Sequence, residues 1–403
     1  MSEQTTPNET VNWFLTDNGV LTFEWKEDNG LIPAERLAEV SVDYEIENGG
    51  ELEVRRERFL GYNRPWDDRG ESITEIRIGE GFSEIPEGAF SGLPNLRKVV
   101  LPVSLKTIGE KSFQKCPGLE YILFSNGLET IGSAAFASCG ALRAITLPPS
   151  LKAIGRDAFS NCKGLEHVDL PEDLESIGAT AFEGCGSLRS VSLSASLTEL
   201  GYHAFSDCMS LEHVDLPDGL ESIGGGNGYF DRASSLRRMG GHGAFEGCKS
   251  LRKISLPSSL KKIESGAFCG TGLQSVAIPD GVERIGEAAF LSCENLESVS
   301  LPDSLKTIEG HAFQDCASLR EISFPEGLTE IGPNAFKGCR NLRSVSVPES
   351  VTEIGENAFP DCEEAELPKH IRNLDEIFGG NRKSKRITHR RKPLIVRPIK
   401  RKK

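Results

Sequence analysis

The chain has 403 residues, of which only 38% are hydrophobic, and its formal net charge is −14. The sequence has no run of 18 apolar residues, which excludes a transmembrane helix, and eleven cysteines are an odd number for a disulfide framework. The charge is segregated: residues 382–403 hold twelve Lys/Arg and no Asp/Glu, so the first 381 residues carry −26.

The first 72 residues differ from everything that follows. Residues 1–10 are polar, predict disorder and do not resemble a signal peptide, which favours an intracellular (cytoplasmic or nuclear) location. Residues 11–72 predict a β-rich N-terminal cap, because Asp17-Asn18-Gly19 separates two alternating apolar runs in the manner of a hairpin. Residues 42–46 and 51–54 predict a second hairpin, and residues 33–40 a short helix.

Residues 73–362 consist of a sequence repeat, whose clearest copy is LRAITLPPSLKAIGRDAFSNC at residues 142–162. The repeat spacing is 23, except for one gap of 40 and one of 22. A fixed period in the twenties predicts stacked units in a solenoid of about twelve coils. The phase is marked by a phenylalanine in each copy: Phe90, Phe113, Phe136, Phe159, Phe182, Phe205, Phe245, Phe268, Phe290, Phe313, Phe336 and Phe359.

Each copy predicts the same local structure. The segment LxxVxLP predicts a short strand of a parallel sheet on one face, with alternate residues buried, and proline ends it. LxxI then returns the chain, and AFxxC predicts a short helical turn on the return side with the phenylalanine inward. Ten cysteines lie three residues after the repeat phenylalanine, whereas Cys269 follows Phe268 directly. One cysteine per coil at one phase predicts free, buried thiols.

The consensus LPxSLKxIGxxAFxxCxxLxxV resembles the 23-residue leucine-rich repeat of the BspA-like family of bacterial and protist surface proteins. The likeness covers roughly residues 11–374, including residues 13–22, Pro65 and Trp66 before the first repeat. The resemblance implies an α/β leucine-rich repeat solenoid. It also implies protein–protein contact and adhesion without catalysis, and a place at the cell surface as the alternative to an intracellular one.

Charged residues alternate in sign between successive copies. After the first Leu of the strand the order begins Arg97, Glu120, Arg143, Glu166, and after the second Leu it begins Lys106, Glu129, Lys152, Glu175. Stacked neighbours therefore attract each other, which favours the correct register between coils of nearly identical sequence.

Two groups of residues are candidates for partner binding. The 17 extra residues 225–241 form an inserted loop that contains aromatic and arginine side chains typical of binding hot spots: Tyr229, Phe230, Arg232, Arg237 and Arg238. Outward strand positions supply the others: Tyr121, Leu123, His167, Asp169, His213 and Asp215. The seven histidines show no metal-ligand spacing, so we expect no catalytic, cofactor or metal residues and no enzyme activity.

Residues 363–380 predict a C-terminal capping segment, and residues 381–403 a disordered basic tail. The tail suits an anionic partner such as nucleic acid, anionic lipid or an import receptor, or it folds back onto the acidic body. Its cations are Arg382, Lys383, Lys385, Arg386, Arg390, Arg391, Lys392, Arg397, Lys400, Arg401, Lys402 and Lys403. The sequence thus favours a non-enzymatic protein-binding scaffold. The alternatives are a nucleic-acid-associated or nuclear factor and a surface adhesin.

Overall fold

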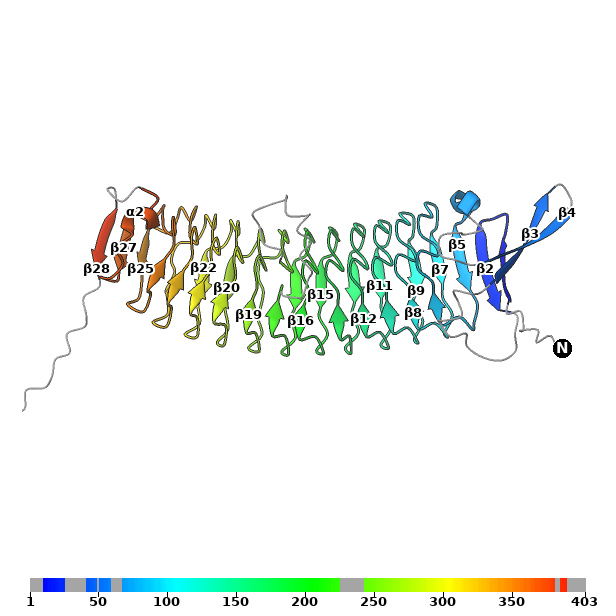
Figure 1. Cartoon of the computed structure of the whole chain (residues 1–403), viewed down its shortest axis with the longest axis horizontal. Coiled ribbons are helices and arrows are strands. Elements are labelled where there is room, and N and C mark those ends of the chain that lie inside the picture. Colours follow the sequence, from blue (N-terminus) through cyan, green and yellow to red (C-terminus); the bar gives the residue numbers. More distant parts are fainter. Residues whose placement is uncertain are drawn as a thin grey trace, which may run out of the picture.

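The protein is a long rod of stacked turns (Figure 1). The computed structural model describes residues 10–25, 41–48, 51–58, 67–224, 243–380 and 385–389. About thirteen turns of a parallel β-solenoid make up the rod, with very little helix, which confirms the predicted leucine-rich repeat architecture. The expected helix at residues 33–40 lies outside the described residues.

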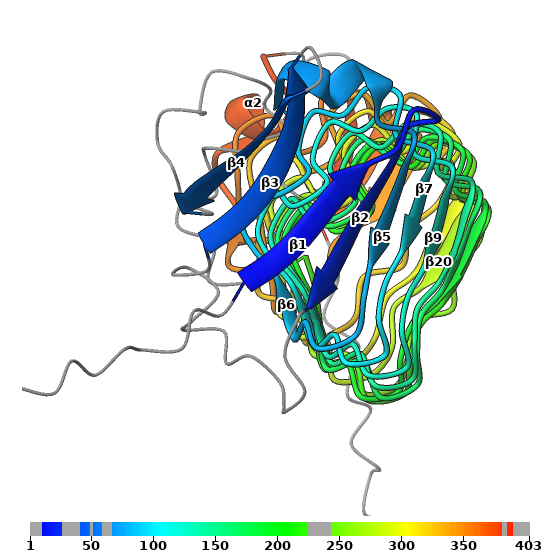
Figure 2. The same cartoon turned by 90° about the vertical axis from the view of Figure 1, so that its right-hand side faces the viewer.

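A β-rich cap covers the N-terminal end of the rod, and Figure 2 shows its strands lying across that end. The strands β1 and β2 are antiparallel, as the turn at Asp17-Asn18-Gly19 predicts, and β3 and β4 form the second hairpin. β1 pairs in parallel with β3, and β2 pairs in parallel with the first solenoid strand, so the cap continues the solenoid sheet. The cap consists of β1 (Thr10–Leu15), β2 (Val20–Trp25), β3 (Ser41–Asn48), β4 (Glu51–Arg58) and the 3-10 helix η1 (Asp67–Ser72).

One face of the rod carries a parallel ladder of short strands in which the middle residue is buried and its neighbours point outward. The strands pair in four separate runs and keep their register within each run, for example Ile145 with Val168. The ladder comprises β5 (Glu75–Ile78), β7 (Lys98–Val100), β9 (Tyr121–Leu123), β11 (Ala144–Thr146), β13 (His167–Asp169), β15 (Ser190–Ser192), β17 (His213–Asp215), β20 (Ser275–Ala277), β22 (Ser298–Ser300), β25 (Ser344–Ser346) and β27 (Glu364–Leu367).

The return side differs from the sequence prediction, because it forms a second parallel ladder where only a connection was expected. The LxxI segments pair turn to turn, for example Ile131 with Ile108 and Ile154. This ladder comprises β6 (Glu84–Ile85), β8 (Thr107–Ile108), β10 (Thr130–Ile131), β12 (Ala153–Ile154), β14 (Ser176–Ile177), β16 (Glu199–Leu200), β18 (Ser222–Ile223), β19 (Lys262–Ile263), β21 (Arg284–Ile285), β23 (Thr307–Ile308), β24 (Glu330–Ile331) and β26 (Glu353–Ile354).

The AFxxC segments form β-turns, not the helical turns that we expected. Asp157 and Asn161, which flank Phe159, have φ angles of 56° and 58°, and L-residues in this left-handed region end a helix. Their N–H groups, with that of Phe159, donate to carbonyls of the next turn, Ala179, Ala181 and Glu183, at 2.6–3.0 Å. Hydrogen bonds along the rod therefore replace those that a helix would make within one turn.

The phenylalanines form one continuous column through the core, as the repeat phase predicts. Successive ring centroids from Phe90 to Phe359 lie 5.2–5.9 Å apart, with nearly parallel planes along most of the column. Leucine, isoleucine and valine from both ladders surround the column in a single apolar core. Each turn thus buries its apolar face only against the turns on either side.

The C-terminal end departs from the predicted disorder of residues 381–403. Residues Arg386–His389 form a strand, β28, that pairs in parallel with β27 and places Ile387 beside Ala365. Ile387 packs partly buried against the core. The helix α2 (Leu374–Ile377) precedes it and buries Leu374 and Ile377. Part of the basic tail is therefore a structural element of the rod end.

Candidate interaction surface

The first ladder exposes two large apolar side chains near the N-terminal end, Tyr121 and Leu123, which we define as the apolar patch. Tyr121 and Leu123 are the two outward residues of β9, exposed by 66% and 71%, and Val103 follows β7 with 70% exposure. Among the residues whose exposure the structure describes, Met209, at 50%, is the one other exposed large hydrophobic side chain. The alternation of burial along the strand places these side chains in solvent, because Ile122 between them fills the core.

The polar border of the apolar patch differs on its two sides. Toward the cap, Glu75 forms ion pairs with Arg77 and Lys98 at 2.8 and 3.2 Å, so these charges are compensated internally. Toward the C-terminus, Ala144 and Thr146 of β11 follow β9 and are small. The neighbouring side chains on this side are therefore smaller than Tyr121 and Leu123, whose exposure leaves them accessible to an apolar partner surface.

The histidine and aspartate residues predicted on this face are exposed but do not form one site. His167 and His213 lie in register on either side of Ser190, two strands apart, which is about 10 Å at the usual strand spacing. Each aspartate instead accepts a hydrogen bond from a hydroxyl group. Thr146 Oγ1 donates to Asp169 at 3.4 Å, and Ser192 Oγ donates to Asp215 at 2.8 Å.

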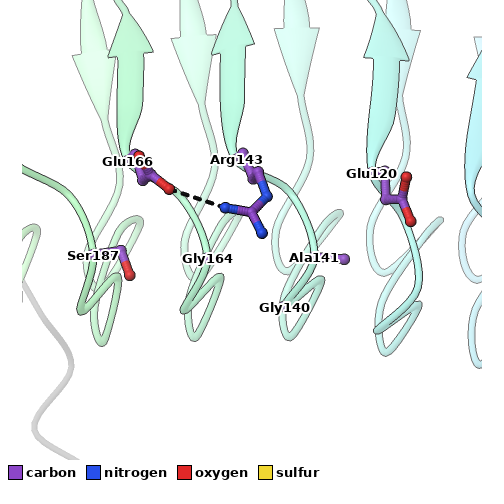
Figure 3. A pocket seen from close by; sticks show the side chains of 7 residues that line it. All are labelled: Glu120, Gly140, Ala141, Arg143, Gly164, Glu166 and Ser187. Carbon is purple, nitrogen blue, oxygen red and sulfur yellow. Dashed lines mark hydrogen bonds and ion pairs between the residues drawn. The ribbon is translucent and has the colours of Figure 1, made fainter.

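A shallow groove of about 470 Å³ lies at the edge of the rod beside the first ladder (Figure 3). Arg143 points across it toward Glu166, with the Nη1 to Oε1 distance at 3.2 Å, while Glu120 stands on the other side. Its floor is backbone, because Gly140, Ala141, Gly164 and Ser187 are small. A Cβ atom at Gly164 would lie 2.4 Å from the Gly140 carbonyl oxygen. The two turns thus leave no room for a side chain at Gly164, although the same position of the repeat is Ala141 in the turn before and Ser187 in the turn after.

The alternating charge columns pair as the sequence predicts. In five ion pairs between residues one turn apart, the distance from the side-chain nitrogen to the carboxylate oxygen is 2.6–3.4 Å. Because these side chains are largely exposed, each pair contributes only a few tenths of a kcal/mol, up to about 1. The pairs are Arg97–Glu120, Lys106–Glu129, Arg143–Glu166, Lys261–Glu221 and Arg320–Glu297.

The cysteines form a ladder inside the rod, and all eleven are free and buried, as predicted. Nine of them place Sγ 3.1–3.3 Å from the carbonyl oxygen of the phenylalanine in the turn before. In the short repeat Thr271 takes the ladder position, and Cys269 lies outside it beside Ala288 and Leu291. The sequence pattern missed this exchange, although Thr271 stands three residues after Phe268 like every ladder cysteine.

Burial raises the pKa of most ladder thiols, strongly for Cys162 and Cys185 and to about 12 for Cys362. Cys293 is the exception: burial acts in the same direction there, but hydrogen bonds from Cys316 and Thr271 lower its pKa. A thiol that stays protonated is a poor nucleophile and a poor metal ligand. The pKa of Glu183 is also raised, mainly by burial and to a lesser degree by the charges of Asp157 and Asp207. The Glu183 carboxyl, however, does not line the groove. Within the described ranges, no group of three His, Cys, Asp or Glu could hold a metal ion.

We expect slow thiol labelling of the native protein and modification of all eleven cysteines after unfolding. The physical reason is that a reagent must open the rod to reach the ladder and must then meet a thiolate. Intact-mass spectrometry after timed alkylation, with and without denaturant, measures both rates. Rapid native labelling of several ladder cysteines, or Cys–Cys links formed without added oxidant, would contradict this expectation.

The other predicted contact residues are only partly within the described structure. Tyr229, Phe230, Arg232, Arg237 and Arg238 belong to the inserted segment, which lies outside the described residues. Of the tail cations, Lys385 and Arg386 are described and both are engaged internally. Lys385 Nζ donates to the Pro360 carbonyl at 2.9 Å, and Arg386 pairs with Glu364 of β27 at 2.5 Å.

Comparison with known proteins gives a consistent result. The model of the BspA type leucine rich repeat region matches residues 69–185, 152–240 and 241–366, with six copies. A leucine-rich repeat protein from Bacteroides ovatus is 23% identical, with 96% of this chain and all of that chain covered and a TM-score of 0.61. At this identity the likeness shows the fold alone.

Two further solved structures are less similar in three dimensions. A leucine rich cell surface protein from Faecalibacterium prausnitzii is 24% identical over 94% of this chain and 93% of that one, with a TM-score of 0.47. The pneumococcal vaccine antigen PcpA is 18% identical over 96% and 98%, with a TM-score of 0.46. A comparison with curated protein sequences gave no significant match.

Proposed function

The chain belongs to the BspA type leucine-rich repeat family, and from this we propose that it is a non-enzymatic scaffold that binds a protein partner on the first ladder, at the apolar patch. The observation that carries the proposal is the exposure of Tyr121 and Leu123, at 66% and 71%, on adjacent outward positions of one strand. Exposed aromatic and aliphatic side chains on a rigid surface mark protein interaction sites.

The rigidity of the surface supports a binding role. β9 is held by pairing with β7 along Lys98–Tyr121 and Val100–Leu123, so both side chains project from a backbone that is already ordered. A partner therefore does not have to order the backbone on binding, which lowers the entropic cost of association. The ladder thiols are buried in the core, and Glu183 does not line the groove, so neither gives support to a catalytic alternative.

We propose further that the protein is intracellular. Eleven free thiols, none of them bridged, favour a reducing compartment and hence an intracellular scaffold. The alternative is an adhesin at the cell surface, which membership of this family supports. In the described part of the chain, no helix is long and apolar enough to cross a membrane. Labelling of intact producing cells with a membrane-impermeant biotin reagent distinguishes the two locations.

The binding proposal is tested with the double variant Tyr121→Ser/Leu123→Ser. We expect a partner captured from an extract by the full-length chain to be lost at least tenfold, because the variant removes the apolar contact area without touching the core. Quantitative mass spectrometry of the captured proteins measures the loss. Met209→Ser, which removes an exposed hydrophobic side chain elsewhere on the rod, is the matched control. Capture that is equal for wild type and both variants would refute binding at the patch.

A further inference from the structure

The two ends of the rod carry opposite charge. Residues 1–72 contain seventeen Asp/Glu and seven Lys/Arg, a formal charge of −10, whereas residues 382–403 carry +12. These segments belong to opposite ends of the molecule, with the cap strands at one end and β28 at the other (Figure 1). The positive charge is thus gathered at one end, whereas the negative charge covers the cap and also the solenoid, whose residues 73–381 carry the remaining −16.

Both ends also present the edge of a sheet. In the seven-stranded sheet that includes the cap, β4 is outermost and pairs only with β3 among the described strands. At the other end β28 is outermost and pairs only with β27 among them. The β3–β4 hairpin projects from the rod end in Figure 1. An edge strand offers backbone N–H and C=O groups to an added strand.

The length of the tail decides which cap it can reach. Residues 390–403 follow β28 and hold eight of the twelve tail cations and no acidic residue. Fully extended, these fourteen residues span at most about 50 Å. The first ladder from β5 to β28 is about 60 Å long at the usual strand spacing, and the cap lies beyond β5. The tail of one molecule therefore cannot reach its own cap.

We propose that the tail beyond β28 docks on the acidic N-terminal cap of a second copy of this chain, at the tip of the β3–β4 hairpin, since the C-terminal half of β4 holds Arg55, Arg56 and Arg58 and is not acidic. Charge complementarity brings the segments together, and residues 394–397, LIVR between two prolines, contain the β-branched residues that suit strand addition. The interface joins unlike surfaces, so each added copy leaves one free cap and one free tail, and the assembly is an open-ended, head-to-tail chain. This inference goes beyond the proposed function, because it does not involve the apolar patch.

Sedimentation velocity of the full-length protein over a range of concentrations tests the association. At 50 mM salt we expect the average mass to rise with concentration above the 43.9 kDa of one chain. At 500 mM salt the mass should return toward one chain, because exposed charges are then screened within about 4–5 Å. A mass of one chain at every concentration in low salt would overturn the proposal.

A complementation experiment tests the direction of assembly with two charge variants. The tail variant replaces four cations by glutamine: Arg390, Arg391, Lys392 and Arg397. The cap variant replaces four carboxylates near the tip of the β3–β4 hairpin by glutamine: Glu45, Glu47, Glu51 and Glu53. Each variant alone should be monomeric, and an equal mixture should form dimers and nothing larger, since only one pair of complementary ends remains.

Two results of this experiment would contradict head-to-tail docking. The first is a tail variant that associates like the wild type, and the second is a mixture that stays monomeric under conditions in which the wild type assembles. Circular dichroism and thermal unfolding of each variant verify that the rod is intact. Because the substituted residues lie outside the solenoid core, the unfolding midpoints should match that of the wild type.

Discussion

Phe182→Ala is expected to destabilise the rod by about 3–5 kcal/mol, the usual cost of truncating a buried phenylalanine. The side chain is fully buried, and its ring centroid lies 5.3 Å from that of Phe159 and 5.2 Å from that of Phe205. Removal of the ring leaves a cavity in a column that neighbouring turns cannot close, since their spacing is held by two ladders. The loss therefore includes both the transfer of the ring and the cavity.

The measurement is urea unfolding followed by far-UV circular dichroism. Because each turn contacts only its neighbours, the damaged interface should also separate the transition of the N-terminal turns from that of the C-terminal turns. Ser190→Ala, an exposed residue on β15, serves as the control and should change stability by less than about 0.5 kcal/mol. A cost below 1 kcal/mol for Phe182→Ala would mean that the phenylalanine column does not hold the turns together.

The phenylalanine column could be predicted because a period of 23 fixes which side chain meets its own copy in the next turn. The second ladder could not. Its strands are two residues long, such as β10, and their pairing with β8 and β12 arises between turns and leaves no local pattern. The same reason explains the absent helical turns, since the N–H of Phe159 finds its acceptor, Ala181, in the next turn at 2.8 Å.

The tail shows how composition can conceal a structural element. The strand β28 is RITH within a run of cations, and its charge predicts disorder. Its order comes from contacts that are distant in the sequence, namely pairing with β27 and the ion pair between Arg386 and Glu364. Of the candidate surface, Tyr121 and Leu123 were predictable from strand alternation, whereas the groove depends on small residues that coincide in successive turns.

Gly243→Ala is expected to destabilise the protein by about 1–3 kcal/mol, the range for overpacking of a tightly packed site. Gly243 is the first described residue after the inserted segment, where the chain rejoins the stack. A Cβ atom there would lie 1.8 Å from the carbonyl oxygen of Gly266, 2.2 Å from its carbonyl carbon and 2.5 Å from Cα of Ala267. All three are backbone atoms of the next turn, so a rotamer change cannot relieve the clash and the two turns must separate.

The control for this prediction is Gly140→Ala, at a different position of the repeat, four residues after Phe136. A Cβ atom at Gly140 would meet nothing within 4 Å, so alanine there should be neutral or stabilising by up to about 1 kcal/mol, through the lower entropy of the unfolded chain. Urea unfolding of both variants under identical conditions gives the comparison. Equal unfolding midpoints for the two variants would contradict the prediction, because they would show that the turn can accommodate a Cβ atom at residue 243. A loss confined to Gly243→Ala would show that the turn after the inserted segment packs too closely to admit a side chain at this position.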